Sequence, residues 1–169
     1  YLGAGIDLSK VLFICTANVE YAILEPLRDR MNIITLPGYI EPEKVEIAVR
    51  HLIPRLLREV NLARTVNNKT ESLINVTWEN GVISKIIQDY TSESGVRNLE
   101  RTLKTILRKV CRRYIESKES GNGIKDFTVN EQILFEFLGP AKVFKNKARL
   151  TKIGVTYGLA WTEHGGELL

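Results

Sequence analysis

The sequence predicts an α+β fold that is mainly helical, and three observations support this prediction. Apolar residues recur at helical spacing through most of residues 41–139. Two short β-branched runs precede this region, and a strand-like stretch follows it from residue 153 onward. We therefore expect an α/β segment over 1–40, a helical domain with a small two-stranded element over 41–139, a linker over 140–152 and the first strands of a further domain over 153–169.

The composition excludes several classes of protein. Of the 169 residues, 44% are hydrophobic and 26% are charged, which is typical of a globular chain and argues against disorder. No apolar run approaches the ~18 residues that a membrane span needs. Cys15 and Cys111 lie far apart without CxxC spacing, which excludes a disulfide scaffold and a zinc ribbon and predicts no metal site. Residue 1 is Tyr and no leader-like pattern follows it, so we expect a piece of a longer protein.

The N-terminal segment carries the features of an α/β domain. Residues 11–17 are a continuous apolar run, which predicts a strand covered on both faces and ending at Asn18. Residues 26–31 begin with Pro and read as a short helix. Residues 33–36 predict a second buried strand, and Pro37-Gly38 then breaks the chain and is the expected hinge.

The helical domain begins at Glu41-Pro42-Glu43, with acids and a proline in the first turn. Pro54 is expected to kink or split this first helix. Residues 61–72 read as polar turns, and residues 73–78 as a short strand. A second helix follows Gly81.

The longest helix is expected from about Val96 to the Ser-Gly-Asn-Gly stop at 120–123. A short strand at 127–129 follows, and Asn130 is a suitable N-cap for a last helix through Leu138.

Positive charge concentrates in two places although the net charge is only +4. Residues 97–119 hold eight Lys or Arg against three Glu, and residues 141–152 hold five without an acid. Such a surface attracts phosphates, nucleic acid or acidic proteins. The alternative is a solvated helix face followed by a basic linker.

Two polar residues in the N-terminal segment are candidates for a functional role. Asn18 follows a predicted buried strand, where open α/β sheets place ligands, although Asn is also a common turn residue. Arg30 follows the short helix and presents a permanently charged guanidinium that suits a neighbour's phosphate. The alternative for Arg30 is a surface ion pair with Asp29 or Glu25.

Arg97 is the third candidate. It is expected in the first turn of the longest helix, where a cation opposes the helix dipole. That position calls for an anionic partner, which is either Glu93 or a phosphate group.

Five blocks in order along nearly the whole chain resemble the ATP-dependent protease Lon. They are VLFICTAN at 11–18, PLRDRM at 26–31, GY at 38–39 with EK at 43–44, ESGVRNLER at 93–101, and GLAWTE at 158–163 with GG at 165–166. The wording of the blocks is closer to mitochondrial members than to bacterial ones. The family is a hexameric AAA+ ATPase fused to a serine peptidase with a Ser–Lys dyad.

This resemblance implies roles for the three candidates. Asn18 would be the sensor-1 residue beside the attacking water, Arg30 the arginine finger that acts on the adjacent subunit's ATP, and Arg97 the sensor-2 residue of the lid. Residues 1–40 would be the end of the AAA+ α/β domain, 41–139 the lid and 153–169 the start of the peptidase domain. The phosphate-binding loop and the dyad would lie outside this chain, which would be inactive alone.

The resemblance also implies cofactors, partners and a compartment. ATP and Mg²⁺ would be bound mainly by segments outside the chain, in a homohexamer that degrades unfolded or damaged proteins. The expected compartment is the mitochondrial matrix, with the bacterial cytoplasm as the alternative.

Two other functions remain open. The basic helix could form a nucleic-acid-binding module, although no aromatic residues interleave with the charges. The helical unit could also be the lid of another AAA+ protein, such as a helicase or a clamp loader, although the block at 158–166 argues against this.

Overall fold

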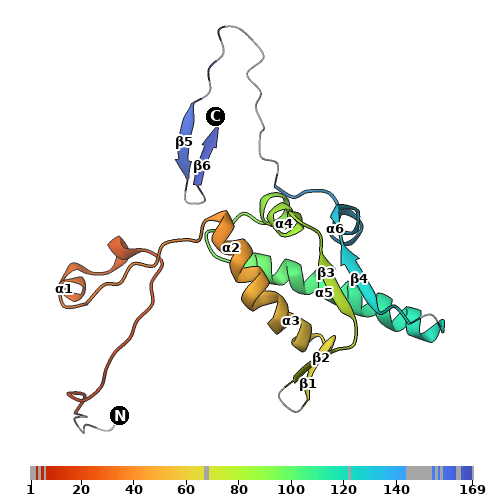
Figure 1. The fold of residues 1–169 in the computed structure, drawn as a ribbon. Coiled ribbons are helices and arrows are strands. Elements are labelled where there is room, and N and C mark those ends of the chain that lie inside the picture. The colour runs from red at the N-terminus through yellow and green to blue at the C-terminus, as the bar shows by residue number, and fades with distance from the viewer. Residues whose placement is uncertain are drawn as a thin grey trace. The chain divides into compact units, whose positions relative to one another are not determined.

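The computed structural model describes residues 3, 5, 7–66, 69–121, 123–143, 154, 156, 158–162 and 165–168. The chain forms two compact units, Tyr1–Pro37 and Gly38–Leu169. Among the described residues, every strand and most of the helices belong to the second unit, as the labels in Figure 1 show.

The first unit contains two short helical elements within its described residues. These are the 3₁₀ turn η1 (Glu20–Ala22) and the helix α1 (Glu25–Arg28). Pro26 lies in the first turn of α1, where its missing N–H leaves no helical hydrogen bond unmade. The short helix expected over 26–31 is therefore confirmed, although it ends at Arg28.

The prediction of two strands in the first unit is wrong. Residues 11–17 and 33–36 belong to no helix or strand. Their apolar side chains are exposed, with Leu12 at 83%, Ile14 at 84% and Leu36 at 86%. A strand is stabilised by hydrogen bonds to a neighbouring strand and by burial of its faces, and the described residues of this unit supply neither.

The second unit opens with a helical stretch that Pro54 divides, as expected. The stretch consists of α2 (Glu41–Ile47), the π-helical turn η2 (Ala48–Leu52) and α3 (Ile53–Glu59). Pro54 has no N–H to donate to the preceding turn. The N–H of Ile53 reaches back five residues to the carbonyl of Ala48, which widens the helix into a π turn just before the proline.

Along the chain, two helices separate the two strands of a parallel pair. The strands are β3 (Asn75–Trp78) and β4 (Asp126–Val129), and the helices are α4 (Val82–Tyr90) and α5 (Arg97–Glu119). Parallel strands need a long crossover, and α4 with α5 provides it. The small two-stranded element, both strands and both helices agree with the sequence prediction.

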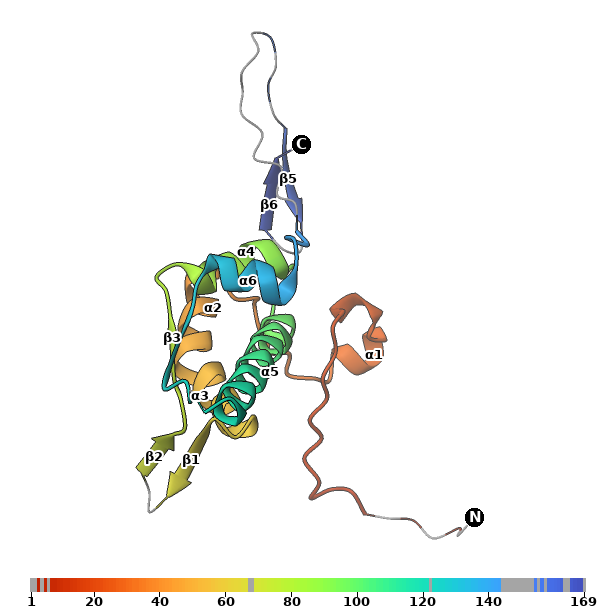
Figure 2. The same ribbon diagram turned by 90° about the vertical axis from the view of Figure 1, so that its right-hand side faces the viewer.

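The core of the second unit is centred on α5. Figures 1 and 2 show this long helix packed with α3, α4 and α6 (Glu131–Leu138). The largest side chains with under 2% exposure are mostly branched aliphatics, namely Leu56, Leu62, Ile86, Leu99, Leu103, Ile106, Leu107, Leu134, Val82, Val110 and Val129. Asn130 caps α6 as expected, because its side-chain oxygen accepts the N–H of Ile133 at 3.0 Å.

Two antiparallel hairpins complete the described structure. The first pairs β1 (Ala63–Val66) with β2 (Lys69–Ser72), where the sequence predicted only polar turns, so that prediction is wrong. The second pairs β5 (Leu159–Thr162) with β6 (Gly165–Leu168) and agrees with the strand-like pattern expected there. Most of the linker predicted over 140–152 lies outside the described residues.

Candidate functional site

The three candidate residues fall in different units. Asn18 lies at a bend before η1 and is exposed. Arg30 lies in the turn after α1, and its N–H donates to the carbonyl of Leu27 at 3.1 Å. Arg97 is the first residue of α5 and is exposed. Asn18 and Arg30 belong to the first unit and Arg97 to the second.

The end of α5 that carries Arg97 is capped from an unexpected position. Val96 occupies the N-cap and makes no side-chain capping bond. The carboxylate of Glu93 accepts the N–H of Asn98 at 2.9 Å and that of Leu99 at 2.8 Å. Two of the helix's free amides are therefore satisfied, and a negative charge lies where the dipole favours one.

This capping removes one of the two anionic partners that the sequence offered for Arg97. Glu93 is engaged with backbone amides, and no ion pair between it and Arg97 is found. Within the described ranges, Arg97 makes no ion pair at all. Its guanidinium is exposed and available to an anion.

Arg30 has the same property. The ion pairs with Glu25 or Asp29 that the sequence left open are not present among the side chains that the structure describes. An exposed guanidinium without a carboxylate partner can approach a phosphate without first breaking an internal pair.

The loop between α4 and α5, residues 91–95, holds the start of the second unit. The N–H of Tyr39 donates to the carbonyl of Ser94 at 2.9 Å. The ammonium of Lys44 donates to the carbonyl of Glu93, and Lys44 is only 8% exposed. Gly38 packs so closely that a Cβ there would lie 2.9 Å from the Cβ of Ser94.

Sequence reasoning missed the role of Lys44. A lysine in a polar turn of an amphipathic helix is ordinarily solvated, and its carbonyl partner lies 49 residues away. The signal available in the sequence is the position of Lys44, which follows the first-turn acids and directly precedes Val45, where the apolar face of the predicted helix begins.

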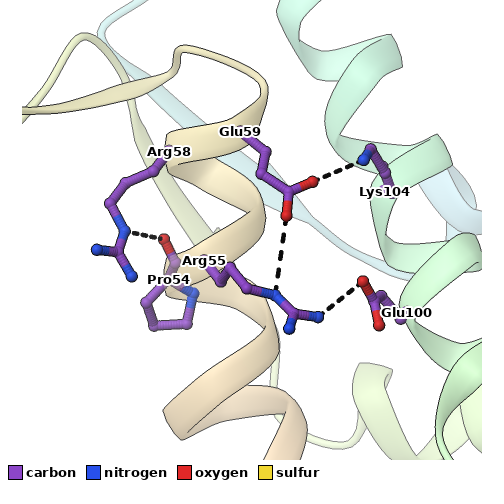
Figure 3. A network of polar contacts seen from close by, with 6 residues as sticks. All are labelled: Pro54, Arg55, Arg58, Glu59, Glu100 and Lys104. Carbon is purple, nitrogen blue, oxygen red and sulfur yellow. Dashed lines mark hydrogen bonds and ion pairs between the residues drawn. The ribbon is translucent and has the colours of Figure 1, made fainter.

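Half of the positively charged side chains on α5 bond to other groups of the second unit. Figure 3 shows part of this arrangement, in which Lys104 bonds Glu59 of α3 at 2.6 Å and Arg55 of α3 bonds Glu100 at 2.7 Å. The hydrogen bond from Lys104 is the main reason why the pKa of Glu59 lies below the usual 4.5. Of the eight α5 cations, the four that bond to other groups are Lys104, Lys109, Arg112 and Arg113. The four whose side chains make neither an ion pair nor a hydrogen bond to any described residue are Arg97, Arg101, Arg108 and Lys118.

A hollow of about 360 Å³ lies beside the first turns of α5. Its lining is mostly polar and consists of Tyr90, Thr91, Ser92, Asn98, Arg101, Thr102, Thr105, Phe137, Leu138 and Lys142. The hydroxyl of Tyr90 donates to the carbonyl of Gly139 at 2.8 Å, and burial raises the pKa of Tyr90 above its usual 10.0. With Arg101 and Lys142 as its charged groups, the lining favours negatively charged groups.

Metal ligands do not gather in the part of the chain that the structure describes. Across the described ranges, no three His, Cys, Asp or Glu side chains gather to hold a metal ion. Helices that the structure describes are all too short or too polar to cross a bilayer.

Comparisons with known proteins identify what the chain is similar to. Residues 68–123 match the family of Lon protease AAA+ ATPase lid domains. The whole chain aligns with a Lon protease from Halothermothrix orenii at 47% identity, with one from Koribacter versatilis at 46% and with one from Desulfovibrio desulfuricans at 42%. In these alignments 100% of the chain covers 20%, 19% and 18% of the respective relative, so the chain spans about a fifth of the length of the curated proteins that it matches.

Proposed function

We infer that this chain is a segment of an ATP-dependent protease of the Lon family, and the observation that carries the inference is the match along the whole chain. A mainly helical unit with a small parallel sheet is consistent with the lid of such a protein. The activity, substrates and assembly of the complete protein are parts of this proposal.

The proposed domain boundaries follow the sequence prediction. Residues 1–40 end the AAA+ α/β domain, 41–139 form the lid, 140–152 link it onward, and 153–169 begin a peptidase domain that uses a Ser–Lys dyad. The division of the chain between Pro37 and Gly38 supports a hinge at this point.

Arg97 contacts the phosphates of a nucleotide bound to its own subunit in this proposal. Its guanidinium is exposed, and the acid that caps its helix bonds to backbone amides instead. Hydrogen bonds from a guanidinium to phosphate oxygens are charge-assisted and stronger than neutral ones. The lid would therefore carry a group whose position reports on the bound nucleotide.

Asn18 and Arg30 complete the proposed ATPase residues contributed by this chain. The Asn18 amide orients the attacking water, and Arg30 reaches a nucleotide held by the neighbouring subunit of a hexamer. An arginine in this role stabilises charge on the transferring phosphoryl group and is worth about 10³–10⁵ in rate. ATP with Mg²⁺, held mainly outside this chain, supplies the phosphoryl group whose transfer to water drives lid rotation.

The test uses the complete protein with Arg97→Ala and a matched Arg108→Ala control. Arg108 lies on the same helix, is exposed and makes no ion pair to a described side chain. We expect Arg97→Ala to raise the KM for ATP about 10–100-fold, the effect of losing a hydrogen bond to a charged group. Equal KM values for the two variants would refute the sensor role of Arg97.

Arg30→Ala tests the arginine finger separately. We expect ATP turnover to fall by about 10³-fold or more while each subunit still binds ATP. Turnover near that of the parent protein would remove Arg30 from the proposal.

Binding of nucleic acid is the second candidate function, favoured by the four α5 cations whose side chains bond to no described residue. If it is the main function, affinity of the chain for duplex DNA falls steeply between two salt concentrations by counterion release. Affinity that is weak and independent of salt would exclude it. Strand β5, which lies in the GLAWTE block, favours a Lon-type lid over that of a helicase or clamp loader.

Partners and compartment are also proposed. Unfolded or damaged proteins are the expected substrates, and the expected assembly is a homohexamer. The mitochondrial matrix stays a prediction, and the bacterial relatives fit the alternative, the bacterial cytoplasm.

A further inference from the structure

We propose that Glu93 and Lys44 are positioning residues for Arg97, and that together they make Arg97 move with the first residues of the chain after Pro37. The proposal rests on the function proposed above, in which Arg97 contacts a bound nucleotide. Neither residue touches the nucleotide in this scheme, and both act through the α4–α5 loop.

Glu93 fixes the first turn of α5. Its two carboxylate oxygens each accept one amide, from Asn98 at 2.9 Å and from Leu99 at 2.8 Å. The first turn of a helix frays when its free amides have no partner. Since Arg97 is the first residue of that turn, the Glu93 carboxylate determines where the Arg97 backbone lies.

Lys44 fixes the backbone of Glu93 itself. The Lys44 residue is only 8% exposed, and its ammonium donates to the Glu93 carbonyl. A buried ammonium needs hydrogen-bond partners, so leaving this carbonyl would expose Lys44 to a large desolvation cost. The backbone of Glu93 is thus bound to α2, and its side chain to α5.

Two further bonds join the same segments. The Tyr39 N–H donates to the Ser94 carbonyl at 2.9 Å, and the Gln88 side chain of α4 donates to Glu41 of α2 at 2.7 Å. The first residues of the second unit and the α4–α5 loop therefore form one bonded cluster. A rotation at Pro37-Gly38 that turns the start of α2 turns the Arg97 backbone as well.

This arrangement explains why the loop carries an acid rather than an N-cap side chain at Val96. A cap at residue 96 would satisfy the helix amides but would leave the helix end unconnected to α2. Glu93 satisfies two amides and offers its carbonyl to Lys44 at the same time.

The experiment measures ATP affinity and turnover of the complete protein with Lys44→Met, Glu93→Gln and Arg97→Ala. Methionine keeps the apolar stem of Lys44 and removes the donor, and glutamine keeps the size of Glu93 but accepts only one amide. The matched control is Lys85→Met, which removes an exposed lysine that bonds Glu131 at 2.7 Å on α6. Each variant is also combined with Arg97→Ala.

We expect Lys44→Met and Glu93→Gln each to raise the KM for ATP about fivefold to tenfold, because a smaller fraction of lids holds Arg97 in place. Lys85→Met should stay within about twofold, as exposed pairs contribute little. In the Arg97→Ala background the first two changes should have no further effect on KM, because their effect passes through Arg97.

The outcomes separate the two proposals. If Arg97→Ala weakens ATP binding but Lys44→Met and Glu93→Gln behave like Lys85→Met, the positioning role is refuted and the sensor role stands. Effects that add fully to Arg97→Ala also refute positioning, because they indicate general loss of structure. If Arg97→Ala has no effect, both proposals fail. Should Lys44→Met fail to fold, Glu93→Gln, on a partly exposed loop, decides the question alone.

Discussion

Gly38 is the residue whose substitution tests the contact between the start of the second unit and the α4–α5 loop most directly. An alanine Cβ at this position would lie 2.9 Å from the Ser94 Cβ and 3.1 Å from the Ser94 carbonyl oxygen. The second of these atoms belongs to the backbone and accepts the Tyr39 N–H at 2.9 Å. Gly38→Ala therefore has to push the two segments apart.

The loss of stability follows from two destabilising contributions and one contribution that offsets them. Overpacking a methyl group against a well-packed segment costs about 1–3 kcal/mol, and the weakened Tyr39–Ser94 hydrogen bond costs about 0.5–1.5 kcal/mol more. Alanine restricts the unfolded chain relative to glycine, which offsets about 0.4–1 kcal/mol. The net loss of unfolding free energy is about 0.5–4 kcal/mol.

Urea unfolding of the 169-residue chain, followed by far-ultraviolet circular dichroism, measures this loss. With a urea slope of about 2 kcal/mol per molar, the midpoint should fall by about 0.3–2 M. Gly95→Ala is the matched control, because a Cβ at Gly95 would meet no atom within 4 Å. A midpoint for Gly38→Ala equal to that of Gly95→Ala would refute the close contact that we infer.

Three further predictions concern the stability of the second unit, each checked by the same urea midpoint. Asn130→Ala removes the cap that accepts the Ile133 N–H and should cost about 0.5–2 kcal/mol, so an unchanged midpoint would argue against this cap. Leu103→Ala empties a fully buried position in α5 and should cost about 2–5 kcal/mol, whereas a cost under 1 kcal/mol would place the core elsewhere. Because the folded-state pKa of Glu59 is lowered from 4.5, chiefly by Lys104, its contribution is complete above pH 4.5 and is lost as pH falls through the folded value. Glu59→Gln should therefore lose less stability than the parent chain on acidification. If the urea midpoints of the two proteins fall by the same amount as the pH is lowered, this prediction is contradicted.

The helices could be predicted from the sequence because their signals are local. The apolar stripe of α5 recurs every three or four residues, and the Ser-Gly-Asn-Gly stop follows at once. The effect of Pro54 on the first helix is equally local, since it depends on one missing N–H. These features need no knowledge of distant parts of the chain.

Some strands could not be predicted in this way, although β3, β4 and β5 agree with their local patterns. Residues 11–17 have a stronger β pattern than residues 63–66 and 69–72, yet only the latter two form strands. Pairing needs a neighbouring strand, and β1 finds one in β2, which begins three residues after β1 ends. The apolar run at 11–17 has no such neighbour among the described residues of its unit, so its pattern does not become a strand.

The candidate site could be predicted from the sequence only in part. The sequence correctly marked Arg97 as a cation at the wrong end of a helix dipole and left two partners open. The structure removes one of them, because the Glu93 carboxylate bonds to the amides of Asn98 and Leu99. The Glu93 carboxylate interacts favourably with the positive end of the helix dipole and does not form an ion pair with Arg97. A helix end that needed only stability would be served by that acid with a neutral residue at position 97, so the exposed guanidinium is the feature on which we base the proposal that Arg97 contacts an anion from outside this unit.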